Sequence, residues 1–131
     1  MAPVALDSDV VIAFLDSAGE QHERAVSELR PRLAASEQIV VSASVYAEVM
    51  IRPMQRGNDA KVDEFLDAIG ATVVEIDRAL ARHAAQLRAR HRSLRLPDAL
   101  SLATALAAGA ELLTLDQGLR RIAAREGRPG G

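Results

Sequence analysis

The chain contains no cysteine and very few aromatic residues. Without cysteine, its 131 residues can form neither disulfide bridges nor thiolate metal sites. One tyrosine and two phenylalanines are too few for a stacking platform, so aromatic stacking is not expected to recognise single-stranded nucleic acid. No 18-residue apolar run predicts a transmembrane helix, and no basic stretch followed by an apolar one predicts a signal peptide. The sequence therefore predicts a cytoplasmic protein that does not bind a membrane.

The composition indicates one folded domain. Hydrophobic residues make up 49% of the chain and charged residues 26%, which is typical of globular proteins. A chain of 131 residues can bury a hydrophobic core without cross-links. We expect residues 1–126 to form a single domain and residues 127–131 to be a frayed tail.

Charge is distributed unevenly along the sequence. The formal net charge of −2 would ordinarily argue against a nucleic-acid partner. However, six arginines and no acidic residue lie between Arg78 and Pro97, and four more arginines lie near the C-terminus. The segment from Arg78 to Arg95 is either a phosphate-binding surface or a solvated helix face, and composition does not choose between them.

Short apolar runs alternate with helical patterns through the whole chain. Strands are predicted at the apolar run before Asp7 and at residues 38–41, 72–76 and 112–115, with a helix after each. We expect Pro31 to kink or end the second helix and Pro53 with Gly57 to end the third. Strands that alternate with helices predict an α/β domain with a central parallel sheet of four or five short strands.

Acidic residues recur where these strands end. Asp7 follows the first strand and Asp116 the fourth. Glu48 lies in the middle of the helix after the second strand, and Asp98 lies in the first turn of the helix before the fourth. Singly, each acid has an ordinary explanation as a helix cap, a dipole partner or a solvated residue. Together they lie at the carboxyl ends of the strands, where parallel sheets bind ligands. Their carboxylates offer only oxygen atoms to a metal, which suits Mg²⁺ or Mn²⁺.

Other catalytic arrangements are not supported. The three histidines show no H-E-x-x-H spacing for zinc. No serine occupies a G-x-S-x-G turn, so a Ser-His-Asp hydrolase is not indicated.

Five segments, taken in order, resemble the PIN domain family, and more closely the VapC-type toxins of bacterial toxin–antitoxin pairs. They are L-D-S-D-V-V-I-A-F-L-D, H-E-R-A, S-A-S-V-Y-A-E-V, L-P-D-A-L-S-L-A-T-A and L-L-T-L-D, and together they cover nearly the full chain. The resemblance implies a three-layer α/β/α fold and an endoribonuclease that uses Mg²⁺ or Mn²⁺. It also implies a homodimer that is inhibited by a small VapB-like antitoxin.

The resemblance assigns the acidic cluster residue by residue. Asp7, Glu48, Asp98 and Asp116 correspond to the family's metal-binding and catalytic acids, with Asp9 and Thr114 as possible supporting residues. Two departures stand out. The chain ends in R-E-G-R-P-G-G where the family commonly adds a fifth strand, and Asp9 stands where many members carry serine, threonine or asparagine.

Two alternatives of other classes remain open from the sequence. D-S-D-V-V resembles the nucleophile motif of haloacid-dehalogenase-type phosphatases, but the only lysine, Lys61, lies far from any predicted strand end. The other alternative is a non-catalytic PIN module that binds RNA or an antitoxin. For the antitoxin, the apolar helix positions Leu15, Val26, Leu29, Val62 and Phe65 predict a groove that accepts an amphipathic helix.

Overall fold

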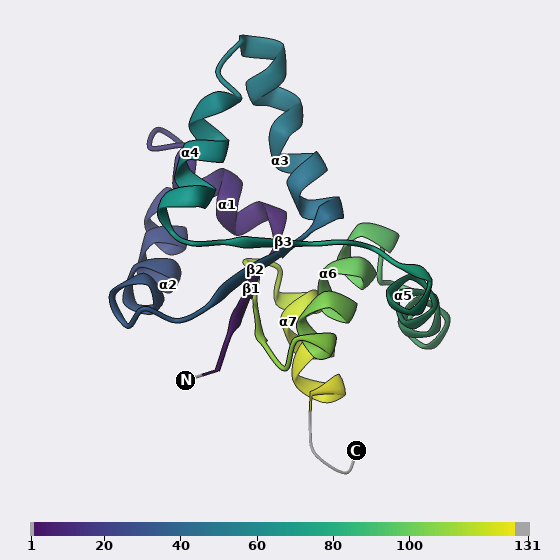
Figure 1. Ribbon diagram of the computed structural model, residues 1–131. Helices are drawn as coiled ribbons and strands as arrows, with labels where there is room; N and C mark the ends of the chain where they lie inside the picture. The colour runs from purple at the N-terminus through teal and green to yellow at the C-terminus, as the bar shows by residue number, and fades with distance from the viewer. Residues whose placement is uncertain (1, 128–131) are drawn as a thin grey trace.

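A computed structural model describes residues 2–127 and shows seven helices around a four-stranded sheet (Figure 1). The strands are β1 (Val4–Leu6), β2 (Ile39–Ser42), β3 (Thr72–Val74) and β4 (Glu111–Leu113). The helices are α1 (Ser8–Leu15), α2 (His22–Ala34), α3 (Ala43–Arg56), α4 (Ala60–Ala68), α5 (Arg78–Arg90), α6 (Leu96–Ala107) and α7 (Gln117–Glu126).

The sheet is fully parallel, with the strand order β3-β2-β1-β4. The chain steps from β1 to β2 and β3 in one direction and then returns to place β4 on the other side of β1. This reversal creates a topological switch point beside β1, where open α/β sheets bind their ligands. Asp7, the first residue after β1, therefore lies at the most favourable position in the sheet for a site.

Side chains that alternate along the strands build a core on each face of the sheet. Val4 and Leu6 of β1 pack with α1–α4, whereas Ala5 between them faces α6. Helices α5, α6 and α7 form the other layer (Figure 1). Helix α6 is buried nearly all round, as its apolar sequence predicts, and it supports β1, β2 and β4 from below. The predicted three-layer α/β/α fold is confirmed.

The two outer strands are shorter than the sequence predicts. β3 ends at Val74 because its partner β2 ends at Ser42, which lies opposite. β4 ends at Leu113, opposite Leu6, because β1 turns into α1 at that point. The next residue, Thr114, is thereby free to form side-chain contacts instead of a strand ladder.

Neither Pro31 nor Pro53 is itself the end of its helix. Helix α2 continues past Pro31 to Ala34, and α3 continues past Pro53 to Arg56. Both prolines lie near the C-terminal end of a helix, so few later residues depend on the lost hydrogen bond. Gly57, at a φ of 72°, then ends α3 as predicted.

Among the described residues, the sheet has four strands, and α7 continues to Glu126 without a fifth. Of the predicted frayed tail, residues 128–131 lie outside the part that the structure describes. No helix within residues 2–127 is long and apolar enough to cross a membrane.

The predicted partner groove is partly wrong. Leu29 and Val62 are core residues, because α2 and α4 use them to cover the sheet. Leu15 does remain exposed on α1, together with Ile12, while Ile51 and Met54 are exposed on α3.

Candidate metal-binding site

Asp7 is the buried centre of the site. Its side chain accepts hydrogen bonds from the Ser8 backbone N–H at 2.9 Å, from Ser101 Oγ at 3.3 Å and from Thr114 Oγ1 at 2.9 Å. These donors come from α1, α6 and the turn after β4, and Asp7 is only 4% exposed. One carboxylate thus joins three segments that are far apart in the sequence.

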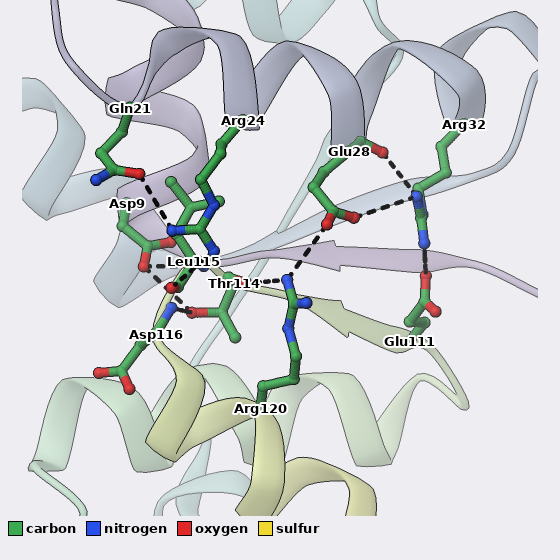
Figure 2. A network of polar contacts seen from close by, with 10 residues as sticks. All are labelled: Asp9, Gln21, Arg24, Glu28, Arg32, Glu111, Thr114, Leu115, Asp116 and Arg120. Carbon is green, nitrogen blue, oxygen red and sulfur yellow. Dashed lines mark hydrogen bonds and ion pairs between the residues drawn. The ribbon is translucent and has the colours of Figure 1, made fainter.

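Asp9 lies two positions after Asp7, in the first turn of α1. Its Oδ2 accepts a hydrogen bond from the Leu115 backbone N–H at 3.1 Å and lies 3.2 Å from Thr114 Oγ1, whose single hydrogen it shares with Asp7 (Figure 2). Among residues 2–127, its Oδ1 is a buried side-chain oxygen without a hydrogen-bond partner. Such an oxygen is costly unless a cation or a water completes its coordination.

Glu48 and Asp98 reach the same region from α3 and from the first turn of α6. Both are half-buried, and burial is the main cause that raises the pKa of each. The charge of Asp7 raises both pKa values further, and the charge of Asp98 also acts on Glu48. These couplings place Asp7, Glu48 and Asp98 in one electrostatic cluster.

Asp116 lies at the exposed rim. It caps α7, with its Oδ1 accepting from the Leu119 backbone N–H at 3.1 Å. Its negative charge raises the pKa values of Asp9 and Asp98, although burial is the larger cause for both. Asp116 therefore caps α7 and also adds negative charge near Asp9 and Asp98.

Burial also dominates the electrostatics of Asp7. It raises the pKa of this carboxyl, the charge of Asp9 raises it further, and the hydrogen bonds from Thr114, Ser8 and Ser101 act in the opposite direction. The site is thus a set of carboxylates whose charged forms are disfavoured by desolvation and by one another.

Arg95 lies at the border of this acidic cluster. Arg95 Nε lies 3.6 Å from Asp98 Oδ2, and the arginine lowers the pKa values of Glu48 and Asp98. The Arg95 side chain is 80% exposed, while that of Asp98 is 16% exposed. The guanidinium is therefore already in contact with water and can move away from Asp98 without losing hydration. Sequence reasoning missed this pairing, although the i,i+3 spacing to Asp98 was visible.

Sequence reasoning also missed Ser101. A polar residue on an otherwise apolar, buried helix, three positions after Asp98, was the available signal. The structure buries Ser101 and directs its hydroxyl to Asp7.

The donor set fits a hard divalent cation. In the described part of the chain, no three histidine, aspartate or glutamate side chains form a group close enough to enclose a metal ion. Mg²⁺ does not need such a cage, since it binds through one or two carboxylates and keeps several waters. All-oxygen ligands, mutual repulsion and the unpartnered Asp9 Oδ1 together fit Mg²⁺ or Mn²⁺.

The arginines of the segment from Arg78 to Arg95 do not form one uniform surface. Arg90 and the neighbouring His91 both bind Glu126 of α7, at 2.9 and 2.6 Å. Arg88 and Arg92 are exposed on the same part of the chain. The segment therefore serves partly to hold α5 against α7.

A sequence model of the PIN domain matches residues 4–125 of this chain. The chain belongs to the PIN domain family. The match includes all six candidate site residues. No curated protein matches the sequence significantly.

Solved structures share the fold of this PIN domain. VapC20 of Mycobacterium tuberculosis, described as a toxin that cleaves the sarcin–ricin loop, is 18% identical over 90% of this chain and 93% of its own, with a TM-score of 0.71. A toxin–antitoxin complex from Klebsiella pneumoniae is 25% identical over 86% of each chain, with a TM-score of 0.68. VapBC2 of Rickettsia felis, bound to a promoter DNA fragment, is 19% identical over 91% of this chain and 92% of its own, with a TM-score of 0.69.

Family membership decides between the enzyme alternatives. A PIN domain is not a haloacid-dehalogenase phosphatase, and Lys61 is exposed on α4, outside the acidic cluster. The D-S-D-V-V segment instead supplies the end of β1 and the start of α1.

Proposed function

We propose that this protein is a metal-dependent endoribonuclease and the toxin of a VapBC-type toxin–antitoxin pair. The observation that carries the proposal is the electrostatic cluster of Asp7, Glu48 and Asp98 at the carboxyl end of β1, with Asp116 at its rim. Membership in the PIN family supports nuclease activity, and the similar VapC structures support the toxin assignment.

We assign one or two metal ions to the four acids Asp7, Glu48, Asp98 and Asp116, with Asp9 and Thr114 in support; each ion would bind one or two of these carboxylates and keep several waters. Bound there, Mg²⁺ or Mn²⁺ would activate a water and neutralise charge that develops on an RNA phosphodiester. The chain's own residues prepare this chemistry. Thr114 and Ser101 orient the Asp7 carboxylate, and Asp7 in turn fixes the start of α1.

Arg95 has a separate role in this proposal. Before substrate binds, it partly neutralises Asp98. With Asp98 holding a metal, the exposed Arg95 guanidinium would be available to a phosphate oxygen of the RNA, which arginine binds through charge-assisted hydrogen bonds.

The experiment compares RNA ends after expression of the wild type and of Asp98→Asn. We expect new 5′-phosphate and 3′-hydroxyl ends with the wild type only, and their loss in EDTA in a purified reaction. Asp67→Asn, an exposed residue of α4, is the matched control and should cleave like the wild type. Cleavage that survives both EDTA and Asp98→Asn would refute the metal mechanism, and RNA binding without cleavage would indicate a non-catalytic module.

A homodimer and a small inhibitory partner are part of the same proposal. The exposed apolar side chains Ile12 and Leu15 on α1, and Ile51 and Met54 on α3, are available for such contacts. Co-expression with the product of an adjacent small reading frame should yield a stable complex that relieves growth inhibition. Free growth during expression of the toxin alone would contradict the toxin assignment.

A further inference from the structure

The turn Thr114–Asp116 carries two residues of the candidate site on only three positions. Its N–H groups point inward: Leu115 N–H donates to Asp9 Oδ2, and Asp116 N–H donates to Thr114 Oγ1 at 3.2 Å. The Thr114 and Leu115 carbonyls accept hydrogen bonds from side chains outside the turn, whereas the Asp116 carbonyl accepts the Arg120 backbone N–H within α7. The position of both site residues therefore depends on the orientation of these peptide planes.

Two arginines hold these carbonyls from outside (Figure 2). Arg120 of α7 donates from Nη2 to the Thr114 carbonyl at 2.8 Å, and Arg24 of α2 donates to the Leu115 carbonyl at a longer 3.4 Å. The shorter bond makes Arg120 the principal contact.

Arg120 is itself held by a chain of charges that leads to α2 and back to β4. Its Nη2 also lies 3.4 Å from Glu28 Oε1, and Glu28 Oε2 lies 3.8 Å from Arg32 Nη1. Arg32 then binds Glu111 Oε1 at 2.7 Å, at the start of β4 (Figure 2). The guanidinium of Arg120 thus binds α2 through Glu28 while it binds the turn, and Glu28 is in turn linked to β4 through Arg32.

We propose that Arg120 is a positioning residue for the active site: by holding the Thr114 carbonyl against Glu28, it fixes the turn that presents Thr114 and Asp116 to the acidic cluster. The inference rests on the proposed nuclease function for its catalytic meaning. Arg120 does not touch the acids, so it acts only through the turn. Its contacts lie near the surface, where an ordinary ion pair would contribute little to stability.

The experiment compares Arg120→Met, which keeps the apolar stem but removes every donor, with Arg120→Lys. Arg121→Met, at the adjacent exposed position, is the matched control. We expect Arg120→Met to lower kcat by about 10- to 100-fold, as is typical for residues that orient metal ligands, with little change in KM. The melting temperature should fall by less than about 3 °C, and Arg120→Lys should recover part of the lost kcat.

Amide hydrogen exchange provides a readout that does not depend on activity. Exchange at the Leu115 and Asp116 amides should accelerate at least tenfold in Arg120→Met and remain unchanged in Arg121→Met. Equal exchange in the two variants would overturn the inference, and so would accelerated exchange with an unchanged kcat. If the wild type cleaves no RNA, the proposed function fails, and the exchange rates alone then decide whether Arg120 positions the turn.

Discussion

Thr114 offers the sharpest test of how the acidic cluster is held together. Its side chain is 0% exposed, and its hydroxyl lies 2.9 Å from Asp7 Oδ2 and 3.2 Å from Asp9 Oδ2 while accepting from the Asp116 N–H. Thr114→Val keeps nearly the same shape and leaves no cavity. The change in stability therefore reports the lost hydrogen bonds.

The expected loss follows from the charge of the acceptors. A hydrogen bond to a charged group contributes about 1.5–3 kcal/mol, against about 1 kcal/mol for a neutral pair. The Asp116 amide also loses its acceptor, but Asp116 is exposed and water can replace the bond. We expect Thr114→Val to lower the free energy of unfolding at pH 7 by about 2 kcal/mol. For a chain of this size that corresponds to roughly 8 °C in melting temperature.

Thr104 supplies the matched control. It is 1% exposed, and its hydroxyl donates at 2.8 Å to the Leu100 carbonyl within α6, which is a neutral acceptor. Thr104→Val should cost about 1 kcal/mol or less, because no charged group loses a partner.

The difference between the two variants should depend on pH. The Thr114 hydroxyl favours the ionised form of Asp7, whose folded-state pKa burial raises above its ordinary value. The bond to a carboxylate is therefore fully present above that raised pKa and weakens as the pH falls through it. Urea titrations of both variants from pH 7 to pH 4, in EDTA, measure this. Equal losses for Thr114→Val and Thr104→Val at pH 7, or a difference that persists unchanged at pH 4, would refute the reasoning.

Three further predictions concern the acids and the basic segment. Asp7→Asn should slow RNA cleavage by at least about 10³-fold, because losing the central carboxylate costs several kcal/mol of transition-state stabilisation. Single-turnover kinetics, with Asp67→Asn as control, measures the cleavage rate, and a loss below tenfold would contradict the prediction. In EDTA at pH 7, Asp98→Asn should be more stable than the wild type, because the raised pKa of Asp98 shows that its ionised form is costly in the folded state. Urea melts should show that this advantage vanishes as the pH falls toward 4. Mg²⁺ at 100 times its Kd should add about 2.7 kcal/mol to the free energy of unfolding of the wild type. Neutralising Arg88 and Arg92 together should reduce the slope of log affinity for single-stranded RNA against log salt by about 1.4, and a slope equal to that of Arg125→Gln would place these arginines outside the RNA interface.

The sequence predicted the architecture because its signals were local. Apolar runs of three or four residues alternate with helical patterns, and caps such as Ser42 and Asp77 bind the backbone N–H groups that their positions predict. Strand ends were less accurate, because they depend on the partner strand. β3 stops where β2 stops, and the sequence of β3 alone contains no information on that register.

The candidate site was predicted through topology and resemblance rather than through spacing. Asp7 and Asp116 could be placed at strand ends, but Glu48 and Asp98 needed the family pattern. The contacts of Arg95, Ser101 and Arg120 were not predicted, since each depends on a side-chain direction or on a long-range contact. Asp9 was left with an undefined role, and the structure gives it one: it holds the turn after β4.

The positions of these groups show why the fold tolerates a costly cluster of charges. Asp7 must follow β1 directly, where the switch point and the start of α1 leave it buried. Its own hydrogen bonds do not remove the penalty, because burial and Asp9 still raise its pKa. The residues that lower the penalty, Thr114 and Ser101, are neutral donors that orient the carboxylate without neutralising it. A cationic side chain beside Asp7 would have offset its charge, but it would have occupied the oxygens that a divalent cation needs. The arrangement is therefore consistent with a site that gives up folding stability in order to keep its carboxylates available to a metal.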